Sequence, residues 1–125
     1  MSISLQLYVP DPEKAVLGAI LLDSGSSERY CFNLSPDVFA VDVNRKLFKV
    51  MLKLMSEKKH IDLTILAEAL PKVDPSYIYS LLEVVASAAG IKAHIDILTS
   101  RYIFKQITYQ CGLTQKRYRK KNLTF

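Results

Sequence analysis

The longest apolar stretch of the chain runs from Ala15 to Leu22 and contains no polar side chain. It is too short to cross a bilayer, which takes about 20 helical residues. It is also too uniform for a helix with one wet face, so we expect a helix that is buried on nearly all sides. Asp11, Pro12 and Glu13 form a helix start: a cap, a proline at the first position and an acid in the first turn. A buried strand is the alternative, which the cap and the few β-branched residues disfavour.

The segment from Asp42 to Lys59 has the apolar repeat of an amphipathic helix. Asp42 or Asn44 begins the helix. Its apolar stripe recurs at helical spacing and consists of Val43, Leu47, Val50, Met51, Leu54 and Met55. The opposite face is basic and consists of Arg45, Lys46, Lys49, Lys53, Lys58 and Lys59. A solvated surface is the ordinary interpretation of such a face, and a phosphate-binding face is the alternative.

Shorter helices are predicted by their capping residues, which are Ser27, Ser35, Asp62 and Asp74. Ser27 is the candidate cap of a helix over residues 28–33. Ser35 opens a single turn that ends near Phe39. The helix after Asp62 ends before Pro71, because the residue that precedes a proline avoids the helical conformation.

A long helix is predicted to begin at Ile91 and to reach at least Gln110. Its core-facing side consists of Ile91, His94, Ile95, Leu98, Tyr102 and Lys105. Gly112 either caps this helix or lies inside one that continues to Tyr118. We find no convincing strand, no repeat and no linker. The sequence therefore predicts an all-α fold, a compact bundle of about six helices with a long C-terminal helix.

The long helix carries more large apolar side chains than one core-facing side can use. The additional ones are Ile97, Ile103, Phe104, Ile107 and Tyr109. A second apolar stripe on a terminal helix is typical of a partner surface, and we expect these residues to mediate self-association. Alternatively, the N-terminal arm, Met1–Val9, folds back and covers them.

The positive charge of the chain is concentrated at its C-terminal end. Residues 1–100 contain 10 Lys and Arg against 12 Asp and Glu, and residues 101–125 contain 7 against none, which together give the net charge of +5. We therefore divide the chain into a helical domain, residues 1–111, and a basic tail, residues 112–125, which extends the long helix if that helix passes Gly112.

Within the tail, basic residues surround one aromatic residue, a pattern that suits phosphates and a stacked base. The candidate nucleic-acid contacts are Lys116, Arg117, Tyr118, Arg119, Lys120 and Lys121. We expect weak, salt-sensitive, non-specific DNA binding that is confined to the tail. A frayed, solvated helix end is the alternative, since cations also suit the helix dipole there.

No motif of cofactor or metal chemistry occurs in the sequence. The glycines form neither a P-loop nor a GxGxxG pattern. His60 and His94 are 34 residues apart and match no zinc spacing, so we interpret His60 as solvated and His94 as hydrogen-bonded and half-buried. Cys31 and Cys111 are interpreted as reduced core thiols of a cytosolic protein. We expect no cofactor, no catalytic residue and no metal, and hence an interaction module rather than an enzyme.

Three stretches in order resemble the N-terminal domain of DnaB-type replicative DNA helicases. DPEKAVLGAILLD is similar to the family's EAExAVLGxxLLD. NRKLFKVMLKLMSEKKHIDLTILAEAL is similar to HRxIFxxMxxLxxxGxxIDLxTLAExL, and SAAGIKAHIDILTSRYIFKQI to SxANIxxYAxIVRExAIxRxL. The likeness covers roughly residues 10–108. Asn44, Gly90 and His94 replace the family's usual His, Asn and Tyr.

The resemblance implies a non-catalytic collar domain that serves ring assembly and partner docking in DNA replication. In the family, such domains pair through a helical hairpin whose first arm corresponds to the long helix. They form a collar on the hexameric helicase and dock primase, with a helicase loader as a further partner. ATP and Mg²⁺ belong to a RecA-like motor, which is absent from these 125 residues, so we expect no ATPase activity.

From the same resemblance we expect this chain to form a weak dimer, and a hexamer to form only when the motor domain is present. The expected location is the cytoplasm, at the replication fork, or the equivalent compartment of an organelle or phage-infected cell. Two alternatives stay open. One is a small stand-alone helical protein that binds nucleic acid through its basic tail, and the other is a helical bundle of unrelated function.

Overall fold

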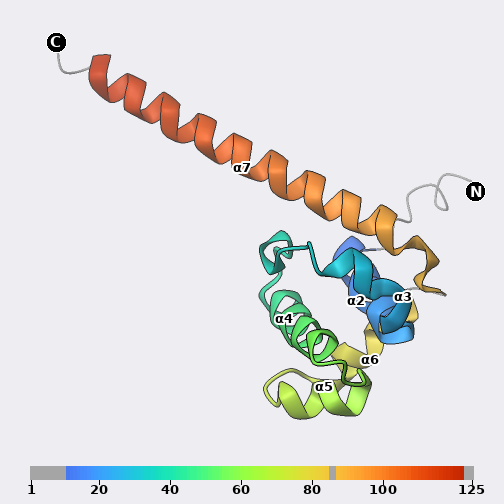
Figure 1. Ribbon diagram of the computed structural model, residues 1–125. Coiled ribbons are helices and arrows are strands. Elements are labelled where there is room, and N and C mark those ends of the chain that lie inside the picture. The colour runs from blue at the N-terminus through green and yellow to red at the C-terminus, as the bar shows by residue number, and fades with distance from the viewer. Residues whose placement is uncertain (1–10, 85–86, 123–125) are drawn as a thin grey trace, which may run out of the picture.

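The structure is a computed structural model that describes residues 11–84 and 87–122, with side chains as far as Gly112. Its elements in chain order are α2 (Pro12–Leu22), α3 (Ser24–Cys31), the 3₁₀ turn η1 (Pro36–Val38), α4 (Asp42–Ser56), α5 (Leu63–Ala69), α6 (Pro75–Val84), the 3₁₀ turn η2 (Ala88–Gly90) and α7 (Ile91–Asn122). The described residues thus form six α-helices and no strand, which confirms the all-α prediction (Figure 1).

Helix α2 lies at the centre of the body and contacts α3, α4, α6, α7 and η2. The carboxylate of Asp11 caps it by accepting the amide of Glu13 at 2.9 Å. Val16, Leu17 and Ile20 are completely buried. The prediction of a helix buried on nearly all sides is confirmed, because every residue from Pro12 to Ile20 except Lys14 is buried.

Helix α3 begins four residues earlier than the sequence suggested, so the prediction of a helix over residues 28–33 capped by Ser27 is wrong. Asp23 ends α2 and also caps α3, since its carboxylate accepts the amide of Ser26 at 3.1 Å. Ser27 lies inside the helix, is buried, and donates its hydroxyl to the carbonyl of Asp23 at 2.8 Å. Asp23 thereby ends α2 and caps α3, and no loop lies between the two helices.

The other predicted starts agree with the structure. Asp62 accepts the amide of Ile65 at 2.8 Å, and Asp74 accepts that of Ser76 at 2.9 Å. The bonds from Ser76 lower the pKa of Asp74. Helix α4 begins at Asp42 without a side-chain cap, and Asn44 lies inside it. The predicted stripe of α4 faces the core, where Leu47, Met51 and Met55 are buried together with Phe48.

Helix α7 consists of 32 residues and passes through Gly112 without a break. Its first turns lie on the body, where Ile91, Ile95 and Leu98 are buried. The helix then runs past the body into open space (Figure 1). Residues 103–111 are all exposed for that reason. No helix among the described residues is long and apolar enough to cross a membrane.

Candidate interaction site on helix α7

The outer face of α7 carries exposed large apolar side chains. Phe104 is 72% exposed, Ile107 57%, Ile103 52% and Ile97 39%. At 100° per residue these four lie within about 120° of one another, on the side opposite to Leu98. The structure therefore groups four of the five residues that the sequence predicted for self-association.

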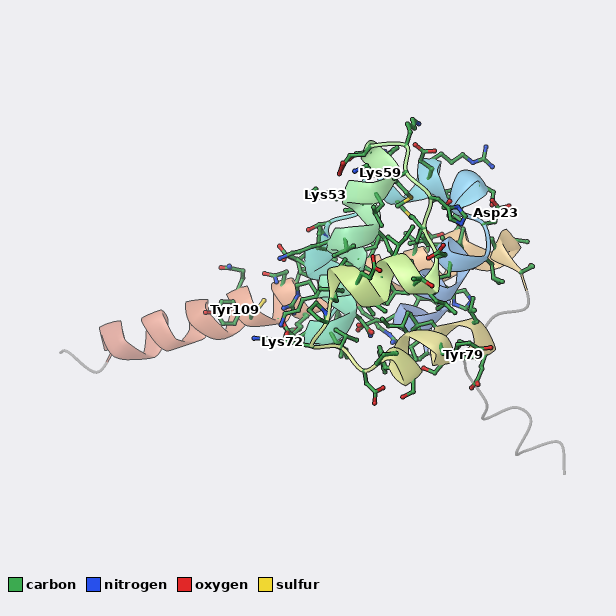
Figure 2. All side chains as sticks on the ribbon, turned by 90° about the horizontal axis from the view of Figure 1, so that it is seen from below. Asp23, Lys53, Lys59, Lys72, Tyr79 and Tyr109 are labelled. Carbon is green, nitrogen blue, oxygen red and sulfur yellow. The ribbon has the colours of Figure 1, made fainter. Side chains whose placement is uncertain are left out.

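Tyr109 does not belong to this group. It follows Leu98 by eleven residues, or about three helical turns, and so lies on the body-facing side of α7. It is 61% exposed because the body has ended before the helix reaches it. Figure 2 shows Tyr109 on the projecting part of α7, whereas Lys53, Lys59 and Tyr79 lie on the body.

The outer face has the spacing of a coiled-coil seam. Alternating steps of four and three residues connect its exposed positions, which are Ala93, Ile97, Ser100, Phe104, Ile107 and Cys111. A 3.5-residue repeat is what keeps the contact line of one helix facing a second helix. Sequence reasoning missed Ala93, Ser100 and Cys111, because it looked for large apolar residues. The spacing itself was the available signal.

The body-facing side of α7 borders a hollow of about 300 Å³. The hollow lies between α7, the turn η1 and the beginning of α4. Its charged lining consists of Glu13, Asp37, Arg45, Arg101 and Lys105. Leu98 and Tyr102 contribute apolar surface to the same wall.

The cations of this hollow differ in how they are held. The guanidinium of Arg45 donates to the carbonyl of Phe39 at 3.1 Å and to the carboxylate of Asp42 at 3.2 Å. Arg101 and Lys105 are exposed and form no ion pair with the residues that the structure describes. Arg45 is therefore fixed in place, and the other two are free to meet a ligand.

The carboxylate of Glu13 accepts three hydrogen bonds. It accepts the amides of Ala40 at 3.0 Å and Val41 at 3.3 Å, and the side-chain amide of Asn44 at 3.0 Å. The side-chain oxygen of Asn44 in turn accepts the hydroxyl of Tyr77. Burial raises the pKa of Tyr77, and the nearby charge of Asp11 adds to this effect. Sequence reasoning did not predict this network, which joins α2, α4 and α6.

The remaining predicted candidates lie apart from this site. The candidate nucleic-acid contacts, residues 116–121, fall in the helical backbone of α7, but their side chains lie outside those described. On the basic face of α4, Lys46 pairs with Asp42 at 3.1 Å, whereas Lys49 and Lys53 have no ion pair among the described residues.

The histidines and cysteines form no metal site, and no group of three metal-ligating side chains occurs in the described part of the chain. His60 is exposed, as expected. His94 is half-buried, as expected. Its Nδ1, however, has no hydrogen-bond partner among the described residues, so the expected hydrogen bond is not seen. Cys31 is buried, which raises the pKa of its thiol to about 12. Cys111 is exposed, so its interpretation as a core thiol is wrong, because α7 has already left the body.

Residues 6–100 match the family described as DnaB-like helicase N terminal domain, and the chain belongs to that family. A curated relative is the replicative DNA helicase DnaB of Rhodothermus marinus. It is 26% identical over 113 residues, which cover 85% of this chain and 12% of that protein. The chain thus spans about an eighth of that relative's length.

The fold is similar to the crystal structure of the N-terminal domain of DnaB helicase from Mycobacterium tuberculosis. The TM-score is 0.76 at 19% sequence identity, and the match covers 86% of this chain and 80% of that one. The fold is therefore that of a DnaB N-terminal domain, as the resemblance implied.

Proposed function

We propose that this chain is a collar domain of a replicative helicase, and that it pairs with a second copy through the outer face of α7. Membership of the DnaB N-terminal family supports the role in replication. The observation that carries the pairing is the exposed seam of Ile97, Phe104 and Ile107 on a helix that projects from the body. The chemistry of the site is association rather than catalysis.

The size of the seam limits the strength of the pairing. A single helix that carries three large apolar side chains provides less buried surface than the roughly 800 Å² per partner of a stable interface. We therefore infer a weak dimer for this chain. A hexamer would require the motor ring that the resembling helicases carry.

Substitution of Phe104 by Asp tests the pairing. F104D places a charge at the centre of the seam, and the dimer should dissociate at least tenfold more readily, since burying an unpaired charge is costly. Sedimentation velocity over a concentration series measures this. The matched control is Tyr79→Asp, an exposed aromatic residue of α6 on the body.

Two results would contradict the proposal. A monomer at every concentration would remove the pairing claim. A dimer that F104D leaves intact, or that Y79D weakens equally, would place the interface elsewhere.

We also propose primase as a partner, with a helicase loader as a further one. Support comes from the family, whose paired domains dock such proteins. A docking surface made by two copies predicts that primase binding weakens in F104D in step with the loss of the dimer. Primase binding that is unchanged in F104D would place the docking surface on the single body.

A further inference from the structure

We propose that the body-facing side of α7 binds single-stranded nucleic acid along a stripe that begins at the hollow and continues down the projecting helix. This site is distinct from the outer face that we propose for pairing. It also extends the DNA contact that the sequence confined to residues 116–121.

The first support is the register of the cations. Arg101 and Lys105 are four residues apart, line the same hollow and have no ion pair among the described residues. Lys116 follows Lys105 by eleven residues, and Arg119 follows Arg101 by eighteen, or about three and five turns. The uninterrupted helix from Ile91 to Asn122 therefore keeps these positions on one side.

The second support is the absence of negative charge along this part of the helix. The last acidic residue of the chain is Asp96, so nothing in residues 101–125 neutralises the stripe from within α7. Positions 101–119 span about 27 Å of helix at 1.5 Å per residue. A cationic track of this kind follows a phosphate backbone and gains free energy from released counterions.

Aromatic residues of this side favour a single strand. Tyr102 lies in the wall of the hollow, and Tyr109 is exposed two turns further on. Bases of an unpaired strand stack on such rings, and this contact is independent of base identity. The paired bases of a duplex are already stacked on each other and do not offer this contact.

The same side is a poor match for an acidic protein segment. Of the large exposed apolar side chains of α7, Ile97, Ile103, Phe104 and Ile107 lie on the opposite face, and Tyr109 lies on this side. An acidic peptide on the stripe would meet cations and two tyrosines, but not the aliphatic side chains of Ile97, Ile103 and Ile107 on the outer face. We therefore infer a nucleic acid as the occupant.

The hollow contains one group that opposes a phosphate. Glu13 already accepts three hydrogen bonds, but the carboxylate of Asp37 is exposed and has no ion pair among the described residues. Its removal should strengthen binding. Asp37→Asn is thus expected to tighten the complex about twofold, which loss of fold would not do.

The main test uses a charge-reversal pair and a matched pair on another face. A fluorescently labelled oligothymidylate is titrated with the full chain, and anisotropy is read at several salt concentrations. Arg101→Glu with Lys105→Glu should weaken binding at least about tenfold and lower the salt slope by roughly 0.7 per lost contact. Lys49→Glu with Lys53→Glu changes the same charge on α4 and should alter affinity less than about twofold. Tyr109→Ala should weaken binding roughly fivefold or more.

Several outcomes would overturn the proposal. Equal losses in both charge-reversal pairs would mean attraction by net charge alone. Full binding by R101E/K105E that disappears when residues 116–121 are neutralised would return the contact to the tail. A duplex bound as tightly as the single strand would remove the stacking argument. Competition by polyglutamate at equal charge concentration would favour an acidic protein segment. Nucleic-acid binding is measured by anisotropy and pairing by sedimentation. A failure of the nucleic-acid proposal is therefore distinguishable from a failure of the pairing.

Discussion

Glu13 shows how one buried carboxylate can fix the relative position of three helices. It belongs to the first turn of α2, and its acceptor oxygens satisfy the amides of Ala40 and Val41, which precede α4 and have no partner inside that helix. Asn44 then passes the connection to Tyr77 on α6. Because α4 has no side-chain cap of its own, Glu13 replaces a local cap with a long-range one.

Substitution of Glu13 by Gln should destabilise the fold by about 1–3 kcal/mol. The side chain keeps its size, but its NH₂ group would face either the amide of Ala40 or the amides of Val41 and Asn44, which bind different oxygens of Glu13. Urea unfolding measures the change. The control is Glu68→Gln, an exposed residue of α5 without an ion pair among the described residues, where a change within about 0.5 kcal/mol is expected. Equal effects at both positions would mean that the network adds nothing to stability.

The sequence could not reveal these residues as partners. Glu13 and Asn44 are 31 positions apart, and Asn44 and Tyr77 are 33 apart. Each residue alone has an ordinary local explanation: Glu13 suits the helix dipole, and Asn44 is a frequent cap. Only the folded arrangement brings their polar groups together, so the core network of the site was missed.

At the scale of elements, local signals predicted most helices and long-range contacts decided the exceptions. Proline-containing starts at Asp11, Ser35 and Asp74 were located correctly, because the cap and the fixed proline angle act within a few residues. The start of α3 was missed since Asp23-Ser24-Gly25 has the composition of a loop. The carboxylate of Asp23 caps this segment, and the buried residues Ser27 and Cys31 anchor the helix that follows.

Helix α2 should dominate the stability of the body. Leu17 is completely buried at the centre of the molecule, and Leu17→Ala should lower the free energy of unfolding by about 2–5 kcal/mol. Denaturant unfolding provides the measurement. Leu22→Ala, on the same helix but 44% exposed, serves as the control and should change it by less than about 1 kcal/mol. A loss below about 1 kcal/mol for L17A would show that Leu17 is not central.

Helix α7 divides its two sides between different tasks. Its early turns contribute Ile91, Ile95 and Leu98 to the core and so anchor the helix. As far as the described side chains reach, the outer face is apolar, and the body-facing side carries the cations Arg101 and Lys105. Of the five side chains that the sequence proposed for self-association, Ile97, Ile103, Phe104 and Ile107 are exposed on the outer face, whereas Tyr109 lies on the body-facing side. The projection of α7, which exposes both sides, depends on where the body ends.

At the scale of the whole molecule, a packed body carries a single long projecting helix (Figure 1). This shape keeps the two proposed surfaces apart. Around the helix, Lys105 and Tyr109 of the stripe lie about 100° and 140° from Phe104, whereas Arg101 lies about 60° from it, at the edge of the seam. Pairing through one side therefore leaves the other side accessible, and a paired molecule would carry two basic stripes.

The separation predicts that pairing and nucleic-acid binding are energetically independent. Ile107→Asp, at another position of the seam, should change the affinity per chain for a short oligothymidylate by less than about twofold, because Ile107 lies about 160° from Lys105 around the helix. Lys105→Glu should leave the dimer constant unchanged for the corresponding reason. In a double-mutant cycle that combines the two, the free energies should add within about 0.5 kcal/mol, as for distant sites without shared partners. Anisotropy and sedimentation on the same four proteins provide the data. A coupling above about 1 kcal/mol would mean that the bound strand contacts both faces, or that pairing reshapes the stripe.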